Sequence, residues 1–305
     1  MPDLRPDLKN ISLERWDHAV FRQNDLHVEV LRLDKIHPEI SGNKWFKLKY
    51  YLENAKKEKK SLLVSFGGAY SNHLLALAAA ARLNGFSSAG YIRGEEPEKP
   101  SHTMLQAKEY GMELRFLSRS EYDLKKKSAL LGNWEENDLH SFLIPEGGAG
   151  IEGIRGSEEI LSLLPLGSFS HICTAVGTGT TMAGLMNSAE PDQKLIGVSV
   201  LKGTRKLEPI DISWIRDGVN PGNIIMVHED HFGGYAKYTP SLIDFMNQTF
   251  AESGIPTDFV YTGKLFFSVI RLAVIKLFPP GSRVLVLHTG GLQGNLSLTP
   301  GLLGY

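Results

Sequence analysis

Residues 171–189 read HICTAVGTGTTMAGLMNSA and contain one complete strand, turn and helix. The short apolar and β-branched run His171–Val176 predicts a strand that is covered on both faces of its sheet. The turn that follows, Gly177-Thr178-Gly179-Thr180-Thr181, leads into a helix that we expect to end at Ala189. Glycines and hydroxyl groups at a helix N-terminus suit a phosphate dianion, because several N–H groups can converge on it. The stretch therefore predicts an α/β fold with a phosphate site.

The same pattern recurs along the chain, since short apolar runs are each followed by Gly or Ser and then by a helix-like segment. The other strands are expected at Val28–Leu33, Leu62–Phe66, Ala89–Arg93, Glu113–Leu117, Leu195–Val200 and Arg283–His288. The other helices are expected at Trp45–Lys60, Asn72–Asn84, Ser157–Leu164, Pro240–Ser253 and Lys264–Leu277. The glycine-rich stretch Pro145–Gly156, PEGGAGIEGIRG, is the best internal boundary, so we expect two lobes joined near it.

Composition excludes several classes of protein. The 305 residues suffice for one large unit or two modest ones. Lys+Arg 33 nearly cancels Asp+Glu 34 and 42% of residues are hydrophobic, which argues against a disordered chain and a basic nucleic-acid surface. One cysteine, Cys173, allows no internal disulfide and favours a reducing compartment. Leu265–Phe278 is too short to span a bilayer and the start has no signal core, so we expect a cytoplasmic protein with no membrane partner.

A second glycine turn, Ser41-Gly42-Asn43-Lys44, leads directly into the helix expected from Trp45. A lone lysine is most often a solvated surface group. Gly42, however, lets the backbone turn closely, and a lysine fixed beside it can point into a cleft. Desolvation there would lower its pKa and make the amine a nucleophile or base. Lys47 and Lys49 are expected on the polar face of the helix.

A third turn, FGGAYSNH at residues 66–73, joins a buried strand to an Ala-rich helix with Ser71 or Asn72 as N-cap. It is either an ordinary strand-to-helix turn or a site for a substrate carboxylate or phosphate, because the unpaired N–H groups and the helix dipole favour an anion. Two more strand ends, VYTGK at 260–264 and LHTGG at 287–291, would face the same edge, where ligands of α/β sheets bind.

Two other interpretations involve a dinucleotide and a metal. In the fingerprint G-x-G-x-x-G the sixth position is Met182, and no acidic residue lies near Ser199 to hold a ribose hydroxyl. Arg205 and Lys206 could instead meet a 2′-phosphate, which keeps an NADP-linked oxidoreductase open as an alternative. The tetrad His228-Glu229-Asp230-His231 is expected to be an exposed polar loop, because no third ligand lies at a zinc spacing.

Taken in order, six motifs resemble one known family. They are SGNKWFKLKY, SFGGAYSNH, AVGTGTTMAGL, GGYAKYTPS, VYTGK and LHTGG, spread between Leu33 and Gly291. The chain resembles the pyridoxal-phosphate (PLP) enzymes of the 1-aminocyclopropane-1-carboxylate deaminase and D-cysteine desulfhydrase family. The resemblance implies PLP as cofactor and the tryptophan-synthase-β-like α/β fold, called fold type II. It also implies a large domain of residues 1–46 and 151–305, a small inserted domain of residues 47–150, and a homodimer.

The resemblance also assigns roles to single residues. Lys44 would bind the cofactor aldehyde. Ser71 and Asn72 would bind the substrate carboxylate, and His73 would also bind the substrate. Asn72 would also reach the ring hydroxyl of the cofactor. Tyr261 would lie beside the cofactor ring and Tyr235 near the substrate. The cofactor phosphate would lie on Gly177, Thr178, Gly179, Thr180 and Thr181.

Thr262 and Thr289 distinguish the two activities of the family and are expected to contact the cofactor. Deaminases that resemble this chain usually carry Glu and Leu there, whereas the desulfhydrases carry Thr at both positions. Hydroxyl groups would leave the pyridine nitrogen closer to neutral, and eliminating a thiolate needs less carbanion stabilisation than opening a cyclopropane. The expected reaction is therefore D-cysteine to pyruvate, ammonia and hydrogen sulfide. Ring opening of 1-aminocyclopropane-1-carboxylate to 2-oxobutanoate and ammonia is the alternative, and a cofactor- or amino-acid-binding protein without activity is a further one.

Overall fold

The computed structural model describes residues 6–130, 139–165, 167–205, 207 and 210–305. Within these ranges the strands form a six-stranded sheet, β1-β2-β10-β7-β8-β9, and a four-stranded sheet, β5-β4-β3-β6. Only the β1–β2 pair is antiparallel among the described neighbouring pairs. The strand bounds are β1 Ser12–Arg15, β2 His27–Arg32, β3 Leu62–Gly67, β4 Ser87–Arg93, β5 Met112–Leu117, β6 Ser141–Leu143, β7 His171–Val176, β8 Lys194–Ser199, β9 Ile224–Val227 and β10 Arg283–His288.

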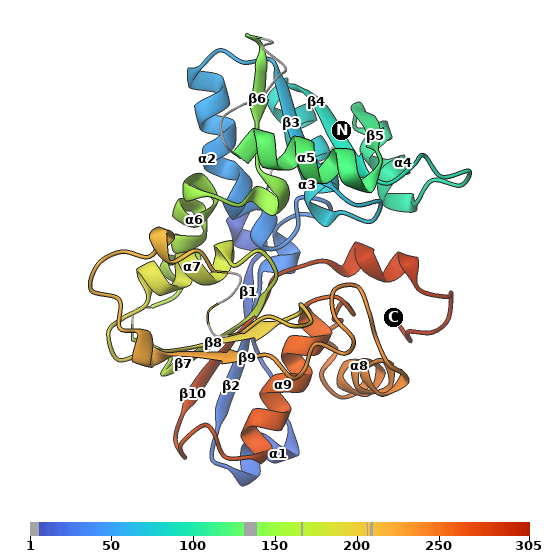
Figure 1. The fold of residues 1–305 in the computed structure, drawn as a ribbon. Coiled ribbons are helices and arrows are strands. Elements are labelled where there is room, and N and C mark those ends of the chain that lie inside the picture. The colour runs from blue at the N-terminus through green and yellow to red at the C-terminus, as the bar shows by residue number, and fades with distance from the viewer. Residues whose placement is uncertain (1–5, 131–138, 166, 206, 208–209) are drawn as a thin grey trace.

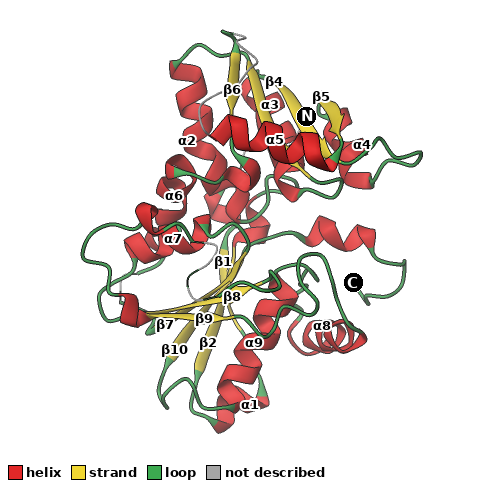
Figure 2. Ribbon diagram, in the orientation of Figure 1, coloured by secondary structure: helices red, strands yellow, loops and turns green. Residues whose placement is uncertain are grey.

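The helices cover both sheets and join them. Figure 1 shows the smaller sheet above the larger, with α6 between α2 and α7 along one side, and Figure 2 separates helices from strands by colour. The helix bounds are α1 Ala19–Gln23, α2 Asn43–Lys57, α3 Asn72–Asn84, α4 His102–Glu109, α5 Arg119–Leu130, α6 Ile151–Glu158, α7 Thr180–Ser188, α8 Pro240–Ser253 and α9 Thr262–Val274. None of the helices in the described ranges is both long and apolar enough to cross a membrane.

The central strands of the larger sheet, such as β7 and β10, are buried on both faces, as their continuous apolar sequences predict. In β10, Val284 and Val286 pack with Leu265 of α9 on one face. Leu285 and Leu287 pack with residues of α6 and α7 on the other face. Because successive side chains of a strand point to opposite faces, such a strand carries no polar alternation.

Several expected elements are confirmed at both ends, while others were not predicted. The strands at 171–176 and 283–288 and the helices at 72–84 and 240–253 have the bounds expected from the sequence. The unpredicted elements are β1, β6, β9, α1, α4 and α5. Most of these are very short, and α5 has the mixed sequence RSEYDLKKKSAL, so neither apolar runs nor periodicity marks them.

The helix expected at Ser157–Leu164 is wrong, because α6 spans Ile151–Glu158 instead. Its first half lies within the glycine-rich stretch that suggested an irregular boundary. A Cβ atom at Gly156 would overlap the carbonyl oxygen of Phe46, and one at Gly153 would overlap that of Gly148. These glycines therefore permit close packing of α6 against α2 and the preceding turn, rather than flexibility. We keep the division into residues 47–150 and the remainder as a proposal, which the two separate sheets support.

Candidate active site

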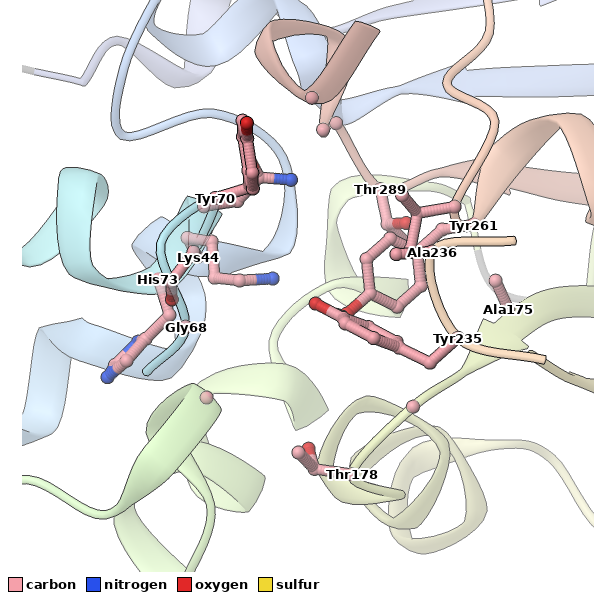
Figure 3. A pocket seen from close by; sticks show the side chains of 18 of the residues that line it. Lys44, Gly68, Tyr70, His73, Ala175, Thr178, Tyr235, Ala236, Tyr261 and Thr289 are labelled. Atoms are coloured by element: carbon pink, nitrogen blue, oxygen red, sulfur yellow. The ribbon is translucent and has the colours of Figure 1, made fainter. Parts of the chain in front are cut away.

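A cavity of about 790 Å³ lies where segments of the two sheets meet. Its walls are formed by the ends of strands and the starts of helices, which is where ligands bind in α/β folds. Figure 3 shows Lys44 and Tyr261 pointing toward each other across it, with Thr178 at one end of the view and Thr289 at the other. The sequence-predicted residues that line it are Lys44, Ser71, Asn72, His73, Gly177, Thr178, Gly179, Thr181, Tyr235, Tyr261 and Thr289.

Lys44 is held at the start of α2 by the turn before it. Gly42 has a φ of +64°, and a Cβ atom there would overlap the carbonyl oxygen of Thr289. The Lys44 Nζ atom donates a hydrogen bond of 2.9 Å to Oδ1 of Asn43 and lies 6.0 Å from the ring centroid of Tyr261. Burial lowers the pKa of Lys44 to about 8, while the Asp258 carboxylate acts in the opposite direction. The neutral amine is therefore far more accessible than in an exposed lysine.

Asn43 connects the lysine to the turn at the start of α7, a role that sequence reasoning missed. Its Nδ2 atom donates a hydrogen bond of 2.9 Å to Oγ1 of Thr181, while its Oδ1 atom accepts the bond from Lys44. The backbone N–H of Asn43 also donates to the carbonyl oxygen of Thr289 at 3.3 Å. One amide side chain thus fixes the spacing between the reactive amine and the predicted phosphate turn.

The predicted phosphate turn lies at the N-terminus of α7. Gly179 adopts a left-handed conformation with a φ of 80°, and the hydroxyls of Thr178 and Thr180 lie 3.0 Å apart. Thr178 lines the cavity, whereas Thr180 is buried behind it and is not among the lining residues. The turn therefore offers backbone N–H groups and one or more hydroxyls to an anion.

Lys47 does not lie on a solvated face, so that expectation is wrong. Only 5% of the residue is exposed, and its Nζ atom donates to Oγ1 of Thr178 at 3.5 Å. It is one helical turn from Lys44 and lines the same cavity, a placement that depends on how α2 packs against other segments. Burial and the charge of Lys44 lower the pKa of Lys47 well below its usual value. Lys49, by contrast, pairs with Glu159 at 2.7 Å, away from the cavity.

The cavity fits the phosphate and the ring of PLP. Two amines, those of the half-buried Lys44 and the buried Lys47, face it, and no described carboxylate forms an ion pair with either. An anion at the α7 turn would offset the cost of burying these amines. The buried Oδ1 atom of Asn72 has no hydrogen-bond partner, so this side chain is available to a bound ligand.

The first turn of α3 offers donors to a carboxylate. Ser71 is the N-cap, and its Oγ atom accepts the N–H of Leu74 at 3.3 Å, which leaves the hydroxyl proton free to donate. His73 lies behind it, with Nε2 2.8 Å from Oγ of Ser65, whose hydroxyl donates to the carbonyl oxygen of Ile144. Burial, together with the charges of Lys44 and Lys47, lowers the pKa of His73 to about 3. The imidazole is therefore neutral near pH 7.

The two predicted tyrosines meet in the cavity. Their hydroxyl oxygens lie 3.5 Å apart and their rings are edge to face, with centroids 6.0 Å apart. Burial raises the pKa of Tyr261 well above its ordinary value, and the neighbouring Tyr235 acts in the same direction. Tyr261 is therefore a protonated hydroxyl that can donate to a ligand.

The two discriminating threonines do not occupy equivalent places. Thr289 lines the cavity, whereas Thr262 is fully buried and is not among the lining residues. The hydroxyl of Thr262 donates to Oδ1 of Asp258 at 2.8 Å and accepts the N–H of Asp258. The Asp258 carboxylate also accepts the N–H groups of Val260 and Tyr261, so it caps the start of α9. Thr289 is the better candidate for a contact with the cofactor ring.

The residues of the two other interpretations lie elsewhere. Arg205 does not line the cavity, and Lys206 lies outside the described residues. Asp230 is tied to Ser268 and Arg271 by hydrogen bonds of 2.7 and 2.8 Å. Within the described part of the chain, no group of three or more metal-binding side chains is assembled.

Comparisons of this chain with known proteins by family pattern, by sequence and by structure agree with one another. The sequence pattern of a family described as pyridoxal-phosphate dependent enzymes matches residues 18–290. A candidate 1-aminocyclopropane-1-carboxylate deaminase of Pyrococcus furiosus is 29% identical over 283 residues, covering 87% of this chain and 85% of that protein. The mitochondrial bifunctional D-cysteine desulfhydrase/1-aminocyclopropane-1-carboxylate deaminase of Arabidopsis thaliana is 26% identical over 309 residues, covering 92% and 76%. The crystal structure of a homologue of the deaminase superposes with a TM-score of 0.80 at 26% identity, covering 96% of this chain and 92% of that one.

Proposed function

Because the chain belongs to the family of pyridoxal-phosphate dependent enzymes, we propose that it is a lyase that deaminates a small amino acid, with D-cysteine as its substrate. The resemblance seen in the sequence is confirmed, and with it the fold type II architecture and the cofactor PLP. The relatives carry the names of two activities, the deaminase and the desulfhydrase. The choice between them is our proposal.

Residues of α2, of α3 and of the turn that starts α7 would hold the cofactor. Lys44 would bind its aldehyde, while Lys47, Thr178 and the N-terminus of α7 would hold its phosphate. Asn72 would meet the ring hydroxyl with its unpartnered side chain. When bound, PLP supplies an electron sink that delocalises the charge left when the α-proton is removed.

The substrate carboxylate would bind at the first turn of α3. There the Ser71 hydroxyl and the free N–H groups of the turn donate to it, and the helix dipole favours its charge. Lys44 would take the α-proton of the substrate, because its lowered pKa keeps a larger fraction of the amine neutral than in an ordinary lysine. Tyr261 would hold a proton near the departing sulfur, since its hydroxyl stays protonated. Loss of the thiolate and addition of water would give pyruvate, ammonia and hydrogen sulfide.

One observation carries the choice of D-cysteine. Thr289, where deaminases that resemble this chain usually carry Leu, places a hydroxyl in the cavity wall, at the end of the view in Figure 3 away from Thr178. Among the described lining residues the sole carboxylate belongs to Glu146, which pairs with Lys126. A neutral partner for the ring nitrogen suits elimination of a good leaving group, for which a weaker electron sink suffices. The deaminase remains the second candidate because the names of two relatives favour it.

A screen of purified protein loaded with PLP tests this proposal. D-cysteine, L-cysteine and 1-aminocyclopropane-1-carboxylate are offered separately, and sulfide, ammonia and 2-oxo acid are measured. We expect sulfide from D-cysteine at least about tenfold faster than from L-cysteine, because one enantiomer alone can present its α-proton to Lys44. Formation of 2-oxobutanoate without sulfide would assign the chain to the deaminases, and turnover of none of the three would refute both candidates.

The pKa of Lys44 gives a prediction about cofactor loading. Only the neutral amine attacks the PLP aldehyde, and with a pKa of about 8 roughly one tenth of it is neutral at pH 7. The rate of loading of cofactor-free protein, followed by the appearance of yellow colour, should rise about tenfold between pH 7 and pH 9 and then level off. A rate that still climbs tenfold per pH unit above pH 9 would show an ordinary exposed lysine.

We also propose that the protein is a homodimer and that it is located in the cytoplasm. The resemblance supports a homodimer, which analytical ultracentrifugation of the loaded protein would test. The buried, unpaired Cys173 supports the cytoplasmic location that the composition suggested.

A further inference from the structure

The segment between β9 and α8 runs along one face of α9 and ends in the cavity. Asp230 bonds to Ser268 and Arg271, the Phe232 ring packs edge to face on Phe267 with centroids 4.9 Å apart, and Gly234 bonds to Lys264. As the segment proceeds from Asp230 through Phe232 to Gly234, its contacts with α9 therefore move back from Arg271 toward Lys264. We call residues 228–238 the tyrosine segment, because this segment carries Tyr235 into the cavity directly after Gly234.

The tyrosine segment has a backbone that needs outside support. Phe232 and Ala236 adopt the left-handed region, with φ values of 49° and 53°, although neither is a glycine. A residue other than glycine is strained in this region, and it persists there where the surroundings hold it. Phe232 is held by its ring contact with Phe267. Ala236, which lies in the cavity wall, is two residues after Gly234, the residue that accepts the bond from Lys264.

Lys264 is a fully buried amine that the proposed reaction does not use. Its Nζ atom donates a hydrogen bond of 2.7 Å to the carbonyl oxygen of Gly234, and the residue is 0% exposed. Burial lowers its pKa to about 8, against the opposing effect of Asp258, so most of the amine is charged at pH 7. A bond from a charged donor to a carbonyl is stronger than one between neutral groups. The bond therefore fixes Gly234 firmly.

Both cavity tyrosines are placed by the same end of α9. Tyr261 is the N-cap of the helix, and Lys264 lies three residues later. Gly234 is the residue before Tyr235, whose hydroxyl lies 3.5 Å from that of Tyr261. Tyr235 itself is 52% exposed, so packing alone holds its ring weakly. The distance between the two hydroxyls depends on where the Gly234 carbonyl is fixed.

We propose that Lys264 is a positioning residue, which holds the Gly234 carbonyl and thereby sets Tyr235 against Tyr261 in the cavity. The proposal rests on the proposed function only in placing Tyr235 near the substrate. Lys264 touches neither substrate nor cofactor. It acts through the tyrosine segment, in the way that second-layer groups orient the residues of a site.

Hydrogen–deuterium exchange of the PLP-loaded protein tests the placement without any assay of activity. The N–H of Gly234 bonds to the carbonyl of His231, and the N–H of Lys237 bonds to the carbonyl of Gly234. Lys264→Met removes the donor while keeping the chain length, and we expect exchange in residues 231–238 to quicken about tenfold. Val274→Ala is the control on the same helix, because Val274 is an exposed residue at the end of α9 and makes none of the three contacts above; it should leave exchange in residues 231–238 within about twofold of the unchanged protein.

A double-mutant cycle tests whether Lys264 acts through Tyr235. If it does, Lys264→Met and Tyr235→Phe each lower kcat, and combining them lowers kcat by no more than about twofold beyond the slower single variant. A purely structural role would lower the melting temperature and give additive losses. Lys264→Arg, which keeps a charged donor, should restore slow exchange and part of kcat.

Two outcomes would overturn the proposal: unchanged exchange in residues 231–238 of Lys264→Met, or additive kinetic losses. If Lys264→Met does not fold, Lys264→Gln is used in its place. The glutamine side chain is about one bond shorter than that of lysine, so it keeps a polar end but does not reach the Gly234 carbonyl. If no substrate is turned over, the proposed function fails, yet the exchange experiment still decides the placement.

Discussion

The Lys44→Ala variant is expected to turn over D-cysteine about three orders of magnitude more slowly than the unchanged protein. The variant loses both the amine that binds the cofactor aldehyde and the base that removes the α-proton. Lys47 lies in the same cavity, but its Nζ atom is directed to Thr178, at the phosphate turn. It therefore cannot replace Lys44 at the reacting carbon.

Borohydride reduction measures the covalent part of this prediction directly. In the unchanged protein the reduced cofactor should be found on the peptide that contains Lys44, and in Lys44→Ala on no lysine. Lys49→Ala is the matched control, because Lys49 lies on the same helix and pairs with Glu159 away from the cavity. Labelling of a different lysine in the unchanged protein, or full turnover by Lys44→Ala, would falsify the assignment.

The Lys47→Met variant is expected to bind PLP about 100-fold more weakly, a loss of about 3 kcal/mol, because the phosphate would lose the buried amine that donates to it. Methionine keeps the apolar length of the side chain, so the packing of α2 should change little. The measurement is equilibrium dialysis of the cofactor-free protein against PLP at fixed pH and salt concentration.

Pyridoxal, which lacks the phosphate, separates this effect from a general loss of binding. Its affinity should be the same in Lys47→Met and in the unchanged protein within about twofold. Lys49→Met serves as the control for removing a lysine from this helix. Equal weakening of PLP and pyridoxal would mean that Lys47 supports the fold of the cavity rather than the phosphate.

What could be predicted from the sequence was the local unit of strand, turn and helix. Strands such as His171–Val176 are apolar throughout, and their glycine turns are adjacent in sequence, so neighbouring residues suffice to define them. The GTGTT turn, the SNH turn and the GNK turn were found in this way, and the structure brings them to one cavity. The order of the motifs then pointed to the family.

Contacts between distant segments could not be predicted in this way. Lys47 has the spacing of a polar helix face, yet α2 is covered there by the turn that contains Gly148, whose Cβ atom would lie 3.0 Å from that of Lys47. Asn43 binds a residue of α7, and Asp258 caps the helix that carries Thr262. The glycines of α6 look like linker residues in sequence, because the carbonyl of Phe46 that requires Gly156 belongs to another helix.

The burial of α3 has a mechanical consequence. Every residue from His73 to Ala81 is buried, so the helix has no free side along which it can slide. Ser71, at the half-buried start of this helix, therefore keeps its place relative to the four-stranded layer. Helix α2, which carries Lys44, packs in the same core cluster as α3, so the packing of these two helices sets the separation between a captured carboxylate and the Lys44 amine.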